Sequence, residues 1–130
     1  PHIVPIWGIQ REEELEQFIC LEKNPPALTG SIEQGIETDK RQLSGSFCRS
    51  CGYCLPCPVN IPIPNAARMK FLLRRAVYQN FITEQWQEQM NRIEDCIECN
   101  QCANRCPYHL NTPALLKEML ADYRDFIRNC

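Results

Sequence analysis

The chain has 130 residues, ten cysteines and a net charge of −2 at pH 7. This length allows one domain with a modest core and short extensions. Lys and Arg are interspersed with Asp and Glu, so the sequence offers no basic patch for nucleic acid or a membrane surface. No apolar stretch approaches the roughly 18 residues that span a bilayer, and the first residues lack the features of a secretory signal. We expect a cytoplasmic protein with no nucleic-acid or membrane partner.

The first 47 residues predict a short strand and two helices. Residues 3–6 form an apolar run that predicts a strand, and residues 11–19 predict a helix after Gly8. A second helix is predicted from Ser31 to about Leu43, because Ser31 and Gln34 have the spacing of a capping box. The apolar residues expected on the buried sides of these helices are Leu15, Phe18, Ile19, Ile32, Ile36 and Leu43.

The middle of the chain predicts two further helices. Residues 61–64 read Ile-Pro-Ile-Pro and must be extended, so a helix can begin only after them and is predicted over about residues 65–78. Thr83 is the predicted cap of the next helix. The apolar residues at helical spacing in these two helices are Met69, Leu72, Leu73, Ala76, Val77, Trp86, Met90 and Ile93.

The final segment predicts the longest apolar stripe. Thr112 is the predicted N-cap of this helix, and Pro113 is expected at its first helical position. The stripe that follows consists of Leu115, Leu116, Met119, Leu120, Tyr123, Phe126 and Ile127. No segment after residue 20 has the alternation of a strand, so the predicted fold class is all-α after a short strand-helix extension.

Eight of the ten cysteines lie in two short runs. The runs are Cys48, Cys51, Cys54 and Cys57, followed by Pro58, and Cys96, Cys99, Cys102 and Cys106, followed by Pro107. The second run is the CxxCxxCxxxCP pattern of bacterial [4Fe-4S] proteins. The first run departs from it by one residue fewer before its last cysteine. Each run is followed by a proline, an extended stretch and an apolar helix, so residues 48–130 form a diverged twofold repeat.

The spacing of the cysteines predicts how two [4Fe-4S] clusters share them. A loop with a cysteine at every third residue reaches three irons of a cubane but not easily the fourth. In two-cluster ferredoxins the fourth thiolate is the last cysteine of the other run. The predicted ligands are Cys48, Cys51, Cys54 and Cys106 for one cluster, and Cys96, Cys99, Cys102 and Cys57 for the other.

Zinc, disulfides and free thiols are the alternatives. Zinc favours two separated CxxC pairs around one tetrahedral ion, and disulfide frameworks belong to secreted proteins. Cys20 and Cys130 stand outside the runs, and we interpret them as structural thiols. We interpret His109 as a loop residue, Tyr53 as cover over a cluster and Trp86 as a core residue.

The segments FCRSCGYCLPCPVNIPIP (residues 47–64) and CIECNQCANRCPYHL (residues 96–110) resemble the ferredoxin-like domain at the C-terminus of iron-sulfur aldo-keto reductases. Asn60 and Asn100 stand where that family has glycine, and Asn tolerates the left-handed backbone of such turns. The resemblance implies a helical ferredoxin-like domain with two cluster-binding loops over residues 48–130. It also implies a linker and helix over residues 21–47, and the last strand and helix of the reductase barrel over residues 1–20.

The same resemblance implies a longer protein. The barrel would bind NADPH or NADH, with Arg11 near the cofactor phosphate. A barrel needs about 250 residues, so its catalytic residues have no counterpart in this sequence and we assign none. The expected partners are the upstream barrel and an electron donor or acceptor protein that the sequence does not identify.

Two functions stay open at this stage. One is an electron-transfer domain of an oxidoreductase, and the other is a redox-silent iron-sulfur or zinc domain that stabilises a helical interaction module. An enzyme with an open iron site is less favoured, because eight cysteines leave no ligand missing. Reversible reduction separates the first two functions.

Overall fold

The computed structural model describes residue 6 and residues 8–130. The chain forms two compact units, residues 1–41 and residues 42–130. All regular elements of the described residues are helices, which confirms the all-α fold class. The boundary between the units falls inside the second helix, and the segment limits predicted after residues 20 and 47 stay predictions.

The first unit contains α1 (Glu12–Lys23) and most of α2 (Ser31–Leu43). The first turn of α1 carries three glutamates and its last turn carries Lys23, so the charges at both ends complement the helix dipole. Ser31 is the first helical residue of α2 rather than its N-cap, and it follows Gly30, which has a positive φ of 57°. The strand predicted over residues 3–6 lies outside the described residues except for Ile6, which is not in a strand.

The burial predicted for α1 and α2 is wrong. Neither of these two described helices contains a buried residue. The six residues expected inward are half-buried or exposed: Leu15, Phe18, Ile19, Ile32, Ile36 and Leu43. Two short helices enclose too little apolar surface to form a core of their own. Periodicity therefore predicted the helices but not what covers them.

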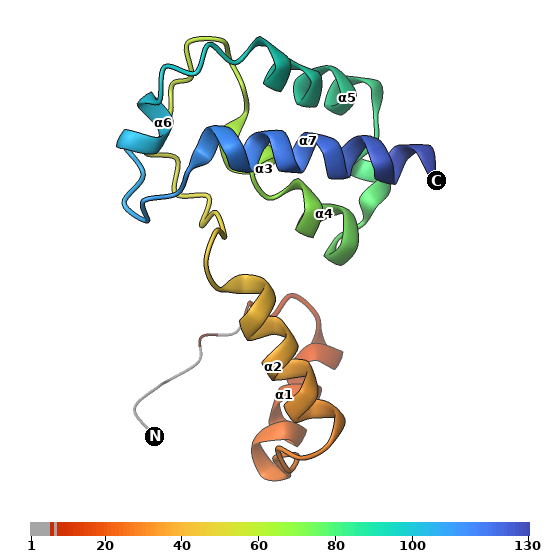
Figure 1. The fold of residues 1–130 in the computed structure, drawn as a ribbon. Coiled ribbons are helices and arrows are strands. Elements are labelled where there is room, and N and C mark those ends of the chain that lie inside the picture. Colours follow the sequence, from red (N-terminus) through yellow and green to blue (C-terminus); the bar gives the residue numbers. More distant parts are fainter. Residues whose placement is uncertain (1–5, 7) are drawn as a thin grey trace. The chain divides into compact units, whose positions relative to one another are not determined.

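In the second unit α7 (Thr112–Arg128) runs through the middle, with α5 on one side and α3 and α4 on the other (Figure 1). Helices α3, α4, α6 and η2 contact α7 directly. The elements around α7 are α3 (Ile63–Ala66), α4 (Met69–Arg75), the 3₁₀ helix η1 (Tyr78–Phe81), α5 (Glu84–Asn91), the 3₁₀ helix η2 (Arg92–Asp95) and α6 (Gln101–Asn104).

The apolar stripe of α7 forms the centre of the core, as predicted. Its buried members are Leu115, Leu116, Met119, Leu120 and Tyr123, and Phe126 and Ile127 pack partly buried against them. The predicted N-cap is wrong by one residue. The Asn111 side chain accepts the backbone N–H of Ala114 at 3.3 Å, and Thr112 is already helical. Asn and Thr are both good N-caps, so the sequence alone does not choose between these neighbours.

The single helix predicted over residues 65–78 is wrong in its limits. Helix α3 begins at Ile63, because Pro64 lies in the first turn, where its missing N–H needs no partner. The chain leaves helical geometry at Arg68, with φ −119° and ψ 5°, and α4 ends before the extended Ala76.

Burial around α4 and α5 follows the prediction except at the end of the first helix. Met69, Leu73, Met90 and Ile93 are buried, whereas Val77 is 63% exposed. The Thr83 hydroxyl accepts the N–H of Trp86 at 3.4 Å, so the cap predicted for α5 is confirmed.

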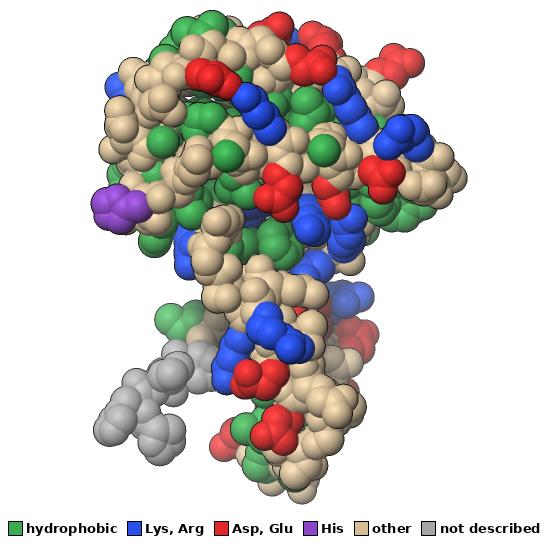
Figure 2. Space-filling view, in the orientation of Figure 1, with side chains coloured by type: hydrophobic (Ala, Val, Ile, Leu, Met, Phe, Trp, Pro, Cys, Tyr) green, Lys and Arg blue, Asp and Glu red, His purple; other side chains and the backbone are tan. Residues whose placement is uncertain are grey.

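Charged side chains of both signs are interspersed on the face of the molecule shown in Figure 2. Three ion pairs connect α7 to neighbouring segments: Arg74 with Asp122 at 2.7 Å, Arg124 with Glu94 at 2.8 Å, and Lys117 with Glu98. Exposed pairs of this kind add little stability each. None of the described helices has the length and apolar content of a membrane span.

Tyr123 links α7 to η1 and gives a stability prediction. Its hydroxyl donates to the Phe81 carbonyl at 2.8 Å, and burial raises the pKa of Tyr123 to about 12. Tyr123→Phe leaves that carbonyl without its donor, so we expect the free energy of unfolding to fall by about 1 kcal/mol at pH 7. Urea unfolding of the wild type and the variant under identical anaerobic conditions measures this difference.

The same pair of proteins tests the pKa. The folded pKa of Tyr123 lies above the unfolded value of 10.0, so the unfolded wild type ionises first and its stability falls from about pH 10 towards pH 12. The phenylalanine variant lacks this loss of stability. The difference in unfolding free energy between the two proteins should therefore narrow between about pH 10 and pH 12. Equal stability at pH 7, or the same alkaline loss in both proteins, would contradict the assignment.

Candidate metal centre

The two cysteine loops have corresponding backbone conformations. In each loop a residue with positive φ lies two positions after the first cysteine, another lies directly after the second cysteine, and a third lies three positions after the last. The three pairs are Ser50 (58°) and Glu98 (51°), Gly52 (80°) and Asn100 (56°), and Asn60 (57°) and His109 (52°). The backbone therefore has the twofold repeat that the sequence predicts.

The chain also leaves both loops by the same turn. The N–H of Asn60 donates to the Cys57 carbonyl at 3.0 Å, and the N–H of His109 donates to the Cys106 carbonyl at 3.1 Å. The left-handed backbone expected at Asn60 and Asn100 is confirmed. The same conformation at His109 was not predicted. The twofold repeat could have predicted it, because His109 lies three residues after Cys106, as Asn60 lies three residues after Cys57.

Two adjoining cavities lie between the loops and the core. The cysteines that line the first are Cys48, Cys51, Cys54 and Cys106. The cysteines that line the second are Cys57, Cys96, Cys99 and Cys102, together with Cys54. Each cavity thus collects three cysteines of one run and the last cysteine of the other, and Cys54 lines both cavities. The assignment of four ligands to each cluster stays a prediction.

The cavities share a wall and an apolar floor. Cys54 and Ile63 line both of them, while Leu115 and Leu116 of α7 lie under the first and the second, respectively. Ile63 is only 2% exposed. A group bound in either cavity would be shielded from water by the core on this side.

Two of the lining thiols, those of Cys54 and Cys102, are poor acids until a cation binds. Burial raises the pKa of the Cys54 thiol to about 11, and burial also raises the pKa of Cys102. Desolvation disfavours a thiolate, whereas a bound metal ion deprotonates its thiol ligands outright. The chemistry of the donors therefore fits a cationic metal group: four sulfur ligands, no competing carboxylate and an apolar floor.

A single zinc ion and a cubane cluster place different demands on four thiolates. A tetrahedral zinc site needs its sulfurs about 2.3 Å from one point. Within residue 6 and residues 8–130, no three His, Cys, Asp or Glu side chains converge on a site for a single ion. The four cysteines of each group instead surround a cavity, which is the arrangement a cubane needs because each iron binds one thiolate.

Sequence analysis missed two residues that line the first cavity, Arg49 and Tyr108. The Arg49 guanidinium lies 4.8 Å from the centroid of the Tyr108 ring and 5.5 Å from that of Phe47. It also donates a hydrogen bond to the Phe47 carbonyl. Arg49 and Tyr108 lie in different loops, so only the tertiary structure brings them together.

The other candidates lie outside the two cavities. Cys20 and Cys130 are exposed thiols, and Tyr53 is 67% exposed; none of the three lines either cavity. His109 also lines neither. Trp86, interpreted as a core residue, is half-buried and packs against the core, with its ring centroid 5.7 Å from that of Phe81.

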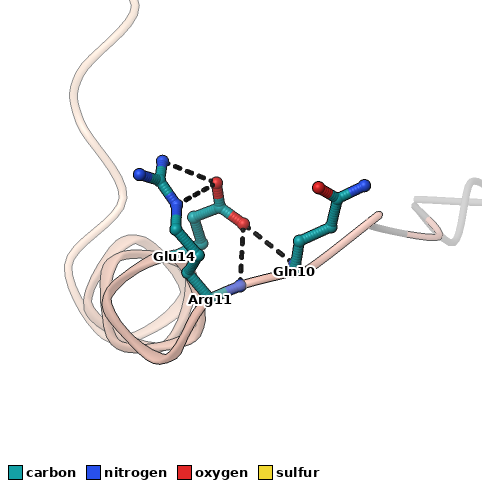
Figure 3. Close-up of polar contacts among 3 residues, drawn as sticks. All are labelled: Gln10, Arg11 and Glu14. Carbon is teal, nitrogen blue, oxygen red and sulfur yellow. Dashed lines mark hydrogen bonds and ion pairs between the residues drawn. The ribbon is translucent and has the colours of Figure 1, made fainter.

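Arg11 lies at the start of α1 and contacts Glu14 (Figure 3). Its Nη2 donates to Glu14 Oε1 at 2.9 Å, and the backbone N–H of Gln10 donates to Glu14 Oε2 at 2.9 Å. These hydrogen bonds, that of Gln10 first, lower the pKa of the Glu14 carboxyl. In this arrangement Arg11 caps the helix, and its predicted contact with a cofactor phosphate stays a prediction.

The loops, the cavities and the donor set define an iron-sulfur protein. The sequence model of the 4Fe-4S dicluster domain family matches residues 47–111, half of the chain. The chain belongs to this family. No curated protein and no solved structure matches it.

The left-handed turn after Cys57 gives a prediction for this site. Asn60→Val places a β-branched residue at φ 57°, and we expect a loss of about 1–2 kcal/mol in unfolding free energy. Asn60→Gly should cost little, because glycine adopts this conformation readily. Asn65→Val, at an exposed position of the short helix α3, is the matched control. Urea unfolding of the three variants measures the effect, and equal stability of Asn60→Val and Asn60→Gly would contradict the account.

Proposed function

We propose that residues 47–130 form an electron-transfer domain that holds two [4Fe-4S] clusters, one in each cavity. The observation that carries the proposal is the grouping of the eight cysteines around two cavities: each is lined by three cysteines of one run and the last cysteine of the other, and Cys54 lines both. A cubane needs four thiolates, one for each iron. Membership of the 4Fe-4S dicluster domain family supports the same chemistry.

The proposed ligands follow the same grouping. Cys48, Cys51, Cys54 and Cys106 hold the first cluster, and Cys96, Cys99, Cys102 and Cys57 hold the second. Support comes from the three matched positions of positive φ in the two loops. The proline turn after each run then carries the chain away from the cavity and towards the core.

The protein supplies position and shielding. A [4Fe-4S] cluster, when bound, accepts and releases one electron at a time. Ile63, Leu115 and Leu116 keep water from the core side of the cavities, while Cys51 and Cys99 lie on the exposed side, where a redox partner has access. Because the cavities share Cys54 and Ile63, an electron has a direct path from one to the other.

The wider setting of this domain is part of the proposal. The loop motifs resemble those of iron-sulfur aldo-keto reductases, and in that setting an upstream barrel with NADPH or NADH would exchange electrons with the clusters. The apolar side chains on α1 and α2, which are 39–49% exposed, offer a surface for such a neighbour. Ten free cysteines also favour a reducing, cytoplasmic compartment.

A redox-silent structural role is the second candidate. It is favoured by the limited secondary structure of residues 47–62 and 95–111, which contain only the four-residue helix α6 and the end of η2. Loops of this kind gain order from a bound metal group. The two candidates differ in whether the clusters take up electrons.

Reduction is the experiment that separates them. Protein purified without oxygen should be brown and should hold about eight iron and eight sulfide per chain, as two cubanes require. A low-potential reductant should bleach the visible absorbance and produce the electron paramagnetic resonance signal of reduced clusters, and air-free reoxidation should restore the starting spectrum.

Three results would count against the proposal. Clusters that resist reduction would favour the structural role, and bound zinc without iron would exclude iron-sulfur chemistry. About four iron per chain would mean that only one cavity holds a cluster. Cys130→Ala, which changes a thiol outside both cavities, is the matched control and should leave the iron content and the spectra unchanged.

A further inference from the structure

The two loops correspond in backbone but not in charge. The repeat pairs Arg49 with Ile97, one position after the first cysteine of each run, and Ser50 with Glu98. Arg49 is the one charged residue in the sequence of residues 47–58. Residues 95–107 carry Asp95, Glu98 and Arg105. The two proposed clusters therefore have different electrostatic surroundings.

The positive charge of Arg49 is fixed beside the first cavity. Arg49 lines that cavity, its guanidinium stacks 4.8 Å from the Tyr108 ring centroid, and it donates to the Phe47 carbonyl. Within the described part of the chain it makes no ion pair with a carboxylate. Its charge is therefore not cancelled by a direct partner.

A backbone donor also favours negative charge at the first cavity. The N–H of Ser50 donates to the Cys48 sulfur at 3.4 Å. Hydrogen bonds to ligand sulfur and nearby positive charge both raise the reduction potential of a cluster.

The second cavity has no cation in its lining, and Lys117, which interacts electrostatically with Cys96, is ion-paired with a carboxylate. No charged residue is found among its described lining residues, and Ile97 occupies the position that corresponds to Arg49. Glu98 forms an ion pair with Lys117, so these two charges largely cancel. Asp95, directly before Cys96, adds a negative charge on this side.

Charge decides which site is reduced first. Reduction transfers one electron from a one-electron donor to a cluster, no bond is broken, and the negative charge of the cluster with its four thiolates rises by one unit. A fixed cation nearby lowers the free energy of the more negative, reduced form. A nearby anion has the opposite effect.

From this asymmetry we propose that the first cavity holds the cluster of higher reduction potential, and that Arg49 is the residue that raises it. At equilibrium, a single electron taken up by the domain would then reside mainly on the cluster that Cys48, Cys51, Cys54 and Cys106 would hold. This inference rests on the proposed electron-transfer function.

A redox titration followed by electron paramagnetic resonance tests the proposal. The wild type should be reduced in two steps at different potentials. Arg49→Gln should make the higher-potential cluster harder to reduce, with a change of about three- to tenfold in its ratio of reduced to oxidised form at fixed potential. Tenfold corresponds to about 59 mV for one electron. Arg49→Lys keeps the charge and should restore most of the wild-type value.

Two variants complete the design. Ile97→Arg places a cation at the corresponding position of the second loop and should make the lower-potential cluster easier to reduce, so that the two steps draw together. Arg128→Gln removes the same charge at the far end of α7, a helix about 25 Å long from its 17 residues, and should leave the separation of the steps unchanged. Unchanged iron content in each variant shows that both clusters are retained.

The outcomes are distinguishable from failure of the proposed function. If Arg49→Gln changes the two reduction potentials no more than Arg128→Gln does, this inference alone is overturned. The same holds if Arg49→Gln shifts only the potential of the lower-potential step. If Arg49→Lys lowers the reduction potential of the first cluster as much as Arg49→Gln does, the positive charge of Arg49 is not what raises that potential. A wild type that accepts no electron would overturn the electron-transfer function and this inference with it.

Discussion

Apolar contact between the start of α7 and the segment that follows the first cysteine run holds the two loops side by side. Ile61 and Ile63 follow the first run, Leu115 and Leu116 follow the second, and all four belong to one buried cluster. Each such side chain contributes about 1.5–3 kcal/mol when fully buried. The cavities lie directly above this contact. Without this apolar contact, the last cysteine of one run would not be held near the first three cysteines of the other.

The sequence was most informative where one local pattern decides one structural feature. The stripe of α7, the Thr83 cap and the left-handed Asn60 and Asn100 were all predictable, because periodicity, capping and the tolerance of Asn for positive φ are local properties. Features that depend on distant residues were not. The break at Arg68, the exposed faces of α1 and α2, and the stacking of Arg49 on Tyr108 depend on what packs against them, and no pattern along the chain contains that information.

The repeat explains both the likeness and the difference of the two sites. Positive φ at three matched positions gives the two loops corresponding turns. Side chains at the matched positions are free to differ, because they project from the turn rather than form it. Arg49 and Ile97 are such a pair, and so are Ser50 and Glu98. A duplicated cluster loop thereby provides two sites with one backbone and two electrostatic environments.

The central claim is that each site takes ligands from both runs, and paired cysteine variants test it most directly. Cys57 and Cys96 line the same cavity, so the double variant Cys57→Ala/Cys96→Ala should keep one intact cluster, with about four iron per chain and one reduction step. Cys48 and Cys57 line different cavities, so Cys48→Ala/Cys57→Ala should damage both clusters. If each run instead bound its own cluster, the two results would be exchanged, and that exchange would contradict the account.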